Sequence, residues 1–424
     1  MTLQTAKGTR DFPAEQAIAR QRIAGALKRI FEIYGYSPLE TPLIERYDVL
    51  AAKYAGGAEI LKETFKLTDQ GGRELALRYD LTVPMCRYLA MNPNLKMPFK
   101  RYQMGEVFRD GPIKLGRYRQ FTQCDVDIVG AASMKADAEI VSIAQSAFRE
   151  LGLDVKIKIN SRKVLNGILD TAKVKESLAE PAILALDKLE KFGVEEVRKE
   201  LKEKKISAES IKAIEGLVAV KGSNEKKIEQ LRKSMKSKQG EEGLREMEEL
   251  LANMVDTSNV IFEPSLARGL AYYTGPVFEA FPIDSEVKSS LAGGGRYDKL
   301  IGNFLGEKKE YPAVGISFGL DAISEAAKAA LSAKTSAKLY VIPIKNYTAA
   351  AKIAAQFREQ GIATDIDLLD RSVGKNLEYA SAMGIPFVAI IGGQEIGQGK
   401  VKLRNMRTGE EALLGAKEAA ERIK

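Results

Sequence analysis

A strand–loop–strand pattern between Arg101 and Val129 constrains the fold of this chain more than any other stretch. Read with the two-residue period of a β-strand, it gives two strands joined by the loop 110–118. One face of the second strand can pack in a core. The other face presents Arg119, Phe121, Gln123, Asp125 and Asp127, and the first strand presents Arg101, Gln103 and Arg109 on one face. The pattern predicts an antiparallel hairpin with an unusually polar face.

Two interpretations of this polar face are open. It is either the solvated outer face of an antiparallel sheet, which is common, or the lining of a ligand site, where buried polar groups find partners. The loop between the strands carries Lys114, Arg117 and Arg119 around glycines, a composition that suits contacts with phosphate.

The chain of 424 residues is long enough for two or three domains. A helix is expected to begin near Pro13 and to end at Gly35. From about residue 165 to 255 the chain is rich in Lys, Glu, Leu and Ala, and strand-and-turn character returns from 260 to 315. This order predicts a helical insertion inside one larger α+β domain. We interpret the lysines of the insertion as mostly a solvated face rather than a nucleic-acid patch.

The last segment alternates apolar runs with helical stretches. The runs 339–344, 362–368 and 387–391 are expected as strands, and 349–360 and 374–383 as helices. This alternation predicts a small parallel-sheet α/β domain. It contains no G-x-G-x-x-G motif, which argues against a dinucleotide site there.

Histidine is absent from the whole sequence. Its absence excludes Ser-His or Cys-His nucleophile pairs, histidine-ligated zinc and a haem held by a proximal histidine. The two cysteines, Cys86 and Cys124, lie too far apart in sequence for a C-x-x-C motif, and a disulfide scaffold is likewise excluded. The net charge of +8 favours a polyanionic partner. Without a signal-peptide pattern or an apolar run of about 20 residues, the chain is expected to be soluble and cytoplasmic.

Two glycine- and tyrosine-rich clusters follow the insertion. In 268–279, Tyr272 and Tyr273 would point to opposite faces if the segment is extended, one toward the core and one toward a ligand. In 292–298, three consecutive glycines let the backbone approach another group closely or allow a tight bend.

These motifs resemble the histidyl-tRNA synthetase family of class II aminoacyl-tRNA synthetases. Segment 108–123, with its Gly-Arg-Tyr-Arg-Gln-Phe core, is similar to the second class II motif in the form typical of that family. Segments 268–279 and 292–298 look like its two histidine-specific motifs, and 77–82 matches as well. Segment 36–45 looks like the first class II motif, which builds the dimer interface, and 313–322 looks like the third.

The resemblance implies an α+β fold with an antiparallel-sheet catalytic domain over 1–330, a helical insertion at about 165–255 and an anticodon-binding α/β domain over 336–424. It implies ATP-dependent ligation of L-histidine to tRNA(His) through a histidyl-adenylate. ATP is then a substrate accompanied by Mg²⁺, no protein-bound metal is expected, and the partners are tRNA(His) and a second copy of the chain in a homodimer.

The resemblance also assigns site residues. The catalytic pair is Arg109 and Arg268. Histidine is expected to contact Asp80, Leu81, Thr82, Arg109, Gln123, Asp127, Arg268, Tyr272, Tyr273 and Tyr297. ATP is expected to contact Arg109, Arg117, Phe121 and Arg268. The nucleophile is the carboxylate of the substrate itself, so a chain without histidine can perform this chemistry.

Three positions depart from the family pattern. Ala322 stands where the third motif usually has an arginine for the γ-phosphate, Ala271 stands at a frequent aspartate position, and Arg109 is followed by Asp-Gly-Pro. Two alternatives stay open, the first motivated by Ala322 and the second by a shared core and C-terminal domain type. One is a histidine-sensing paralogue that does not charge tRNA and acts as a regulatory subunit of ATP phosphoribosyltransferase. Another is a prolyl or threonyl member of class II.

Overall fold

The predicted hairpin is the centre of a large antiparallel-rich sheet. The computed structural model describes residues 3–51, 61–113, 118–268, 272–307, 309–327 and 333–424. The chain divides into a large unit, Met1–Arg10 with Ile23–Ala327, and a small unit, Asp11–Arg22 with Lys328–Lys424. Each unit has its own apolar core.

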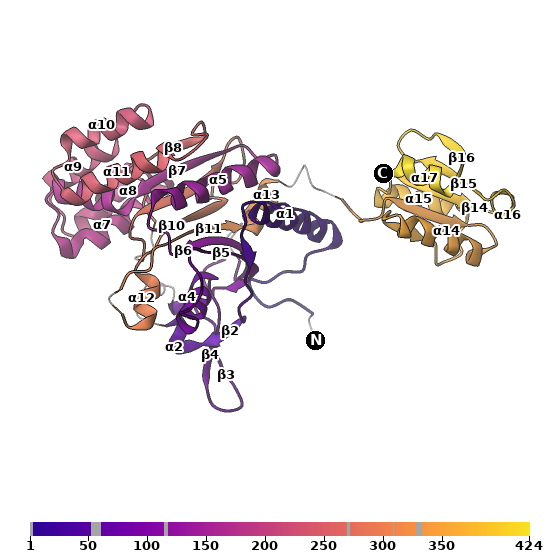
Figure 1. Ribbon diagram of the computed structural model, residues 1–424, viewed down its shortest axis with the longest axis horizontal. Coiled ribbons are helices and arrows are strands. Elements are labelled where there is room, and N and C mark those ends of the chain that lie inside the picture. Colours follow the sequence, from indigo (N-terminus) through magenta and orange to yellow (C-terminus); the bar gives the residue numbers. More distant parts are fainter. Residues whose placement is uncertain (1–2, 52–60, 114–117, 269–271, 308, 328–332) are drawn as a thin grey trace. The chain divides into compact units, whose positions relative to one another are not determined.

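The large unit contains an eight-stranded sheet (Figure 1). Its pairs are antiparallel except at the two ends, where β1 runs parallel to β5 and β8 runs parallel to β7. In spatial order the strands are β1 (Ser37–Pro38), β5 (Phe99–Phe108), β6 (Gln120–Val129), β11 (Ala313–Gly319), β10 (Ala292–Arg296), β9 (Pro276–Pro282), β7 (Val155–Ser161) and β8 (Val260–Phe262). Segments far apart in sequence therefore meet at the middle of the sheet.

The register of β6 decides which side chains share a face. Asp125 of β6 lies opposite Gln103 of β5 on one side and opposite Ser317 of β11 on the other. Asp127 lies between Arg101 and Gly315 in the same way. The polar residues that the two-residue period placed on one face therefore lie side by side across three strands.

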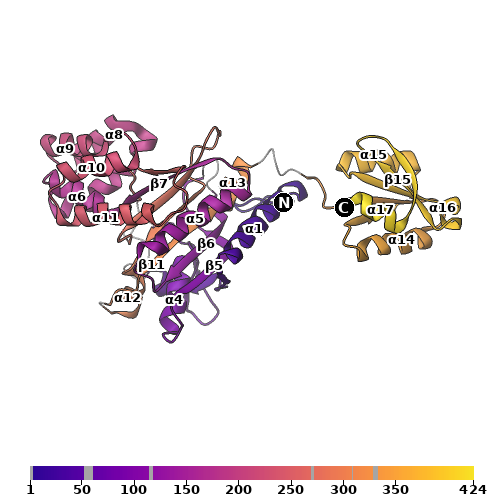
Figure 2. The same cartoon turned by 45° about the horizontal axis from the view of Figure 1, so that its top comes forward.

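Two helices cover the opposite face of these strands (Figure 2). The part of α1 (Ala14–Ile33) that belongs to the large unit buries Phe31, and α5 (Met134–Glu150) buries Phe148. Each of these rings lies 5.6 Å from the ring of Phe318 on β11. The bounds of α1 agree with the helix expected between Pro13 and Gly35.

Shorter elements complete the large unit. A three-stranded sheet has the order β2-β4-β3. The strands and helices are β2 (Ile44–Arg46), β3 (Lys66–Thr68), β4 (Glu74–Leu77), α2 (Tyr47–Leu50), α4 (Thr82–Met91), α12 (Leu300–Leu305) and α13 (Leu320–Ala326).

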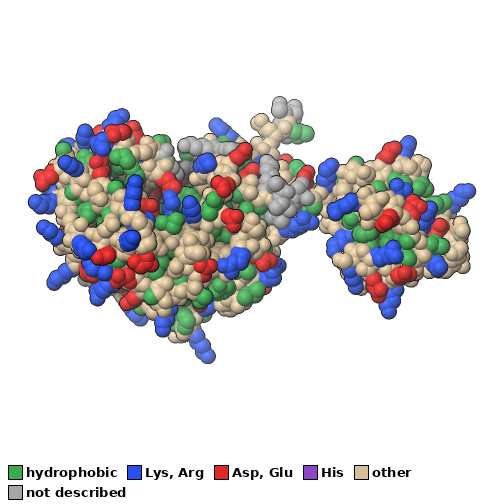
Figure 3. Space-filling model, turned by 90° about the horizontal axis from the view of Figure 1, so that it is seen from above, with side chains coloured by type: hydrophobic (Ala, Val, Ile, Leu, Met, Phe, Trp, Pro, Cys, Tyr) green, Lys and Arg blue, Asp and Glu red, His purple; other side chains and the backbone are tan. Residues whose placement is uncertain are grey.

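The predicted helical insertion lies between β7 and β8. It comprises α6 (Arg162–Thr171), η1 (Glu176–Leu178), α7 (Ala179–Leu186), α8 (Leu189–Glu203), α9 (Ala208–Val218), α10 (Asn224–Ser234) and α11 (Lys238–Ala252). Serine side chains cap the first turns of α6, α9, α10 and α11. On the face that Figure 3 shows, lysine and arginine side chains are interspersed with carboxylates, and within the insertion Lys204 pairs with Glu200 and Lys233 with Glu229.

The small unit contains a five-stranded sheet of order β13-β12-β14-β15-β16. The prediction of a parallel sheet is correct for β13 (Thr364–Ile366), β12 (Leu339–Pro343) and β14 (Phe387–Ile391) but wrong for the remainder. The later strands β15 (Lys400–Asn405) and β16 (Glu411–Gly415) are antiparallel, since their connections are too short for a parallel crossover. The helices are α14 (Tyr347–Glu359), α15 (Val373–Met383), α16 (Gly393–Gly397) and α17 (Ala416–Ile423).

Among the described residues, no helix combines the length and the apolar character needed to cross a membrane.

Candidate active site

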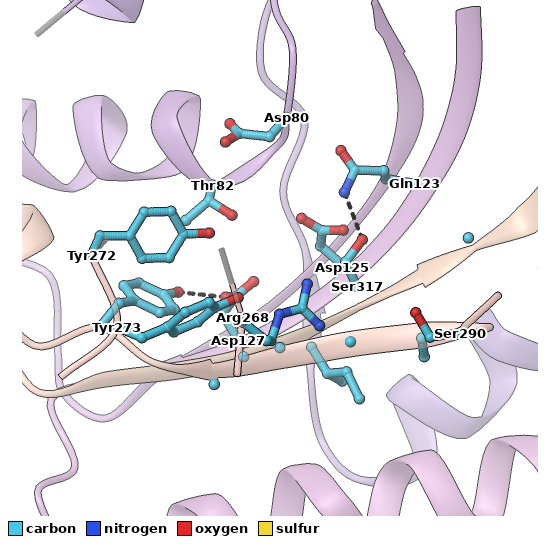
Figure 4. Close-up of a pocket in the computed structure, with 18 of the residues that line it drawn as sticks. Asp80, Thr82, Gln123, Asp125, Asp127, Arg268, Tyr272, Tyr273, Ser290 and Ser317 are labelled. Carbon is cyan, nitrogen blue, oxygen red and sulfur yellow. Dashed lines mark hydrogen bonds between the residues drawn. The ribbon is translucent and has the colours of Figure 1, made fainter. Parts of the chain in front are cut away.

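A cavity of ≈ 260 Å³ opens on the polar face of the large sheet (Figure 4). This volume is close to the lower end of the range of about 300–1,000 Å³ for small-molecule sites. Successive residues of a strand point to opposite faces, so the cavity near Ser317 lies on the side of the sheet away from Phe318, α1 and α5. The wall includes Tyr79, Asp80, Thr82, Arg109, Phe121, Gln123, Asp125, Asp127, Arg268, Tyr272, Tyr273, Ser290, Gly293, Gly294, Gly295, Tyr297, Gly315 and Ser317.

Strand β6 supplies a row of polar side chains to this cavity. Gln123 donates to the hydroxyl of Ser317 over 2.7 Å, and the Tyr297 hydroxyl donates to Asp127. Asp125 and Asp127 are each only 3% exposed. The alternative of a solvated outer face is therefore wrong, because a solvated carboxylate would be open to bulk water.

A buried guanidinium supports the two carboxylates from the neighbouring strand. Arg101 on β5 is fully buried, and its Nη2 lies 2.8 Å from Oδ2 of Asp127. Burial still dominates over this attraction, and it raises the pKa of Asp125 to about 7 and raises the pKa of Asp127 as well. Two carboxylates thus share one cation beneath the cavity.

The two arginines predicted as catalytic both line the cavity. Arg109 follows β5, where its Nε donates to the carbonyl of Tyr79 over 3.0 Å and its guanidinium lies 5.1 Å from the ring of Phe121. Arg268 lies before β9, where its Nη1 donates to the carbonyl of Phe278 over 3.2 Å. The segments that carry them are far apart in sequence, and the sheet brings their side chains to one hollow.

Glycines make room for the charged groups of the site. A Cβ at Gly293 would lie 1.7 Å from Nη1 of Arg268, and a Cβ at Gly315 would lie 1.9 Å from Oδ1 of Asp127. Such distances are far inside van der Waals contact, so a Cβ at either position would displace the charged group beside it. The glycine run at 292–298 predicted that the backbone approaches another group closely. At Gly293 that group is the side chain of Arg268.

The start of α4 forms another wall. Oδ1 of Asp80 accepts a hydrogen bond from the backbone N–H of Val83 over 3.0 Å, and burial raises the pKa of Asp80 to about 6. Thr82 lines the cavity beside it. Leu81, predicted as a histidine contact, is a fully buried core residue that is absent from the described cavity wall, and its carbonyl accepts from Arg101 over 3.3 Å.

The tyrosine pair differs from the expectation of opposite faces. Tyr272 and Tyr273 both line the cavity, with ring centroids 4.7 Å apart, and the ring of Tyr297 lies 6.1 Å from that of Tyr272. The alternating rule fails because these residues lie in a turn before β9 rather than in a strand.

Some site residues were not predicted, and two predicted positions are outside the described residues. Asp125 had a signal, its place in the polar row of β6, whereas Ser290 and Ser317 had no sequence signal. Arg117 and Ala271 lie in segments outside the description. Ala322 lies on α13, close to the cavity. A Cβ added at Gly319, which lines the cavity, would be 3.8 Å from the Cβ of Ala322.

Comparison with known proteins identifies the family. The family model described as histidyl-tRNA synthetase matches residues 8–323, which is more than half of the chain. The chain belongs to the histidyl-tRNA synthetase family. A second model, described as an anticodon binding domain, matches residues 338–424 of this synthetase. The fold is therefore the class II catalytic domain followed by an anticodon-binding domain, as the sequence predicted.

Curated relatives cover almost the whole synthetase. Histidine–tRNA ligase 1 of Bacillus cereus is 43% identical over 415 residues, which is 97% of each chain. Histidine–tRNA ligase of Aeropyrum pernix is 38% identical over 426 residues, covering 98% of this chain and 97% of that protein. A crystal structure of histidyl-tRNA synthetase from Nostoc sp. PCC 7120 matches with a TM-score of 0.89 and 32% identity, over 100% of this chain and 99% of that one.

These matches favour the enzyme over the regulatory paralogue. As a histidyl-tRNA synthetase, the chain is an ATP-dependent ligase for histidine and tRNA. A protein from Bacillus halodurans named ATP phosphoribosyltransferase regulatory subunit/histidyl-tRNA synthetase shares 24% identity with a TM-score of 0.77, which shows the common fold alone. The prolyl and threonyl alternatives are not supported, because the matching catalytic model is the histidyl one.

Proposed function

We propose that the cavity is where this synthetase joins L-histidine to ATP, forming a histidyl-adenylate that then charges tRNA(His). The observation that supports this is the convergence of Arg109 and Arg268 on one cavity that also holds buried carboxylates. Cationic groups suit a reacting phosphate, and buried carboxylates suit a substrate with an ammonium group and an N–H-bearing ring. One cavity therefore offers partners for both the phosphate and the histidyl part of the adenylate.

In this proposal the amino acid lies against α4 and β6. Asp80 and Thr82 hold the α-ammonium at the start of α4, and Gln123 lies close by on β6. Asp127 accepts an N–H of the imidazole. Tyr272, Tyr273 and Tyr297 enclose the ring, and Leu81 supports the wall from the core. A side chain without an N–H would leave Asp127 unpaired, which penalises its binding.

The nucleotide lies toward the other end of β6. Phe121 stacks on the adenine, and Arg109 and Arg268 bind the α-phosphate from two sides, with Arg117 a further ATP contact. The carboxylate of histidine attacks the α-phosphorus and pyrophosphate leaves, so no protein nucleophile is needed. Two fixed guanidinium groups stabilise the charge that develops there, and removing such a donor costs about 10²–10³ in rate.

We propose that Mg²⁺ enters with ATP. Within the described residues, no cluster of three or more acidic or cysteine side chains is placed to hold a metal ion. Mg²⁺ commonly takes most of its ligands from phosphates and water, and there it neutralises phosphate charge. No step above depends on it.

The remaining assignments concern organisation. We propose a catalytic domain over 1–330 with its insertion at about 165–255, an anticodon-binding domain over 336–424, a homodimer built through segment 36–45, and a cytoplasmic location. The match of residues 338–424 to an anticodon-binding domain supports the second of these boundaries.

Histidine-dependent exchange of pyrophosphate into ATP tests the proposed site. We expect exchange with L-histidine alone among free amino acids, and a loss of about 10²–10³-fold in Arg268→Gln. Glu246→Gln on α11, which is not among the described lining residues, should exchange like the unmodified protein. Histidine binding without exchange would contradict the proposal and favour a sensor.

A further inference from the structure

The row of polar residues on β6 contains one carboxylate that the assignments above leave unused. Asp125 lies between Gln123 and Asp127 on the cavity face, and Figure 4 shows it beside Ser317 and Arg268. It is 3% exposed, and its Oδ1 has no hydrogen-bond partner among the residues that the structure describes. A buried carboxylate oxygen without a partner is costly, so a ligand that supplies a cation or an N–H to this oxygen would be bound strongly.

The direct partners of Asp125 differ from those of Asp127. The guanidinium of Arg101 on β5 is 2.8 Å from Asp127. Asp127 also accepts from Tyr297, whereas Asp125 receives a hydrogen bond from the Ser317 hydroxyl of β11. Further charged or titratable groups that face Asp125 are Asp80 and Arg78, from the segment before α4, and Tyr273 and Arg268, from the segment before β9.

Asp125 and Asp127 line the cavity from the same face of β6, so one aromatic ring bound there faces both carboxylates. Residues two apart on a strand are separated by about 6.4–6.8 Å along it. A neutral imidazole has one N–H donor and one acceptor nitrogen, so it satisfies only one of two carboxylates. An imidazolium has two donors and satisfies both.

We propose that Asp125 is a second recognition group for the substrate side chain, and that Asp125 and Asp127 together bind histidine with its imidazole protonated on both nitrogens. The inference rests on the proposed function, because it takes the ring to lie against Asp127. One proton is then shared between Asp125 and the ring in the complex.

Proton uptake follows from this arrangement. Burial raises the pKa of Asp125 to about 7 in the empty site, and free imidazole has a pKa of about 6.5. At pH 8 both groups are therefore mostly deprotonated before binding, and the complex must gain close to one proton from solvent. Asp80 is also deprotonated at that pH and contributes no uptake, because its pKa is about 6.

Calorimetric titration of the whole protein with L-histidine at pH 8, in buffers of different ionisation enthalpy, measures this proton. We expect an uptake close to one in the unmodified protein, close to zero in Asp125→Asn, and close to one in the control Glu246→Gln. Glu246 is a matched control because burial also raises the pKa of its carboxyl, on α11 away from the described cavity wall.

A ligand comparison needs no variant. The analogue 1,2,4-triazolylalanine has a ring of the same shape that stays neutral in this range of pH. The unmodified protein should bind it at least about tenfold more weakly than histidine, since a charge-assisted pair is lost. In Asp125→Asn the ratio of the affinity for histidine to the affinity for the analogue should be smaller. Equal affinities, or no proton uptake by a protein that binds histidine, would overturn this inference alone. Absence of histidine binding would overturn the proposed site with it.

Discussion

The guanidinium of Arg268 occupies the space that a side chain at Gly293 would fill. Gly293 lies on β10 opposite Glu279 of β9, and Oε1 of Glu279 is 3.3 Å from Nη1 of Arg268. The missing Cβ and the paired carboxylate together hold the arginine against the sheet, where it faces the cavity. The position of a proposed catalytic group is thus set by two neighbouring strands.

Gly293→Ala should therefore displace Arg268 and leave most of the fold intact. We expect histidine-dependent pyrophosphate exchange to fall by at least about 100-fold. The free energy of unfolding should fall by about 1–3 kcal/mol, as is usual for overpacking. Gly216→Ala is the control, because nothing lies within 4 Å of a Cβ there and alanine favours the helix α9. Full activity of Gly293→Ala would show that Arg268 is not needed in its observed place.

Tyr297→Phe removes the hydroxyl that donates to Asp127. Because a hydrogen bond to a charged group is lost, KM for histidine should rise on the order of tenfold while KM for ATP stays unchanged. Steady-state exchange kinetics measure both constants. Tyr311→Phe, which removes a surface bond of 2.9 Å to Glu307, should change neither. An equal rise in both constants would point to general damage rather than to loss of ring recognition.

Asp125 should make stability depend on pH. Its pKa is raised to about 7 from 3.8, so the folded protein holds a proton that the unfolded chain has released between these values. The stabilisation of the folded state by this proton is complete below about pH 4 and is lost as the pH rises through about 7. Urea unfolding between pH 5 and 8 should therefore show Asp125→Asn gaining stability relative to the unmodified protein as the pH rises. A constant difference across that range would contradict the assigned environment.

Arg101→Met leaves two buried carboxylates without their shared cation. Removal of one partner from a buried ion pair typically costs about 3–5 kcal/mol, and we expect a loss of that size in urea unfolding at pH 8. The loss should shrink toward pH 5, where protonation of Asp125 relieves the repulsion. Lys233→Met breaks an exposed pair with Glu229, which solvent screens, and should leave the free energy of unfolding essentially unchanged.

The sequence by itself determined the local order of the elements and the chemistry of the β6 row. A two-residue period is enough to place Phe121, Gln123 and Asp127 on one face, and Pro13 and Gly35 are enough to bound α1. The motifs also indicated the family, which the comparisons confirm.

Only the tertiary structure decided what covers that face and what each side chain meets there. Alternation says which residues point the same way, but strand pairing between distant segments places Ser317 beside Asp125 and Gly293 beneath Arg268. The tertiary structure also shows that Arg101 is a buried counter-charge and that Leu81 is buried in the core. It places both Tyr272 and Tyr273 in the cavity wall. The physical reason is that burial and register depend on contacts between residues far apart in sequence, which no local period contains.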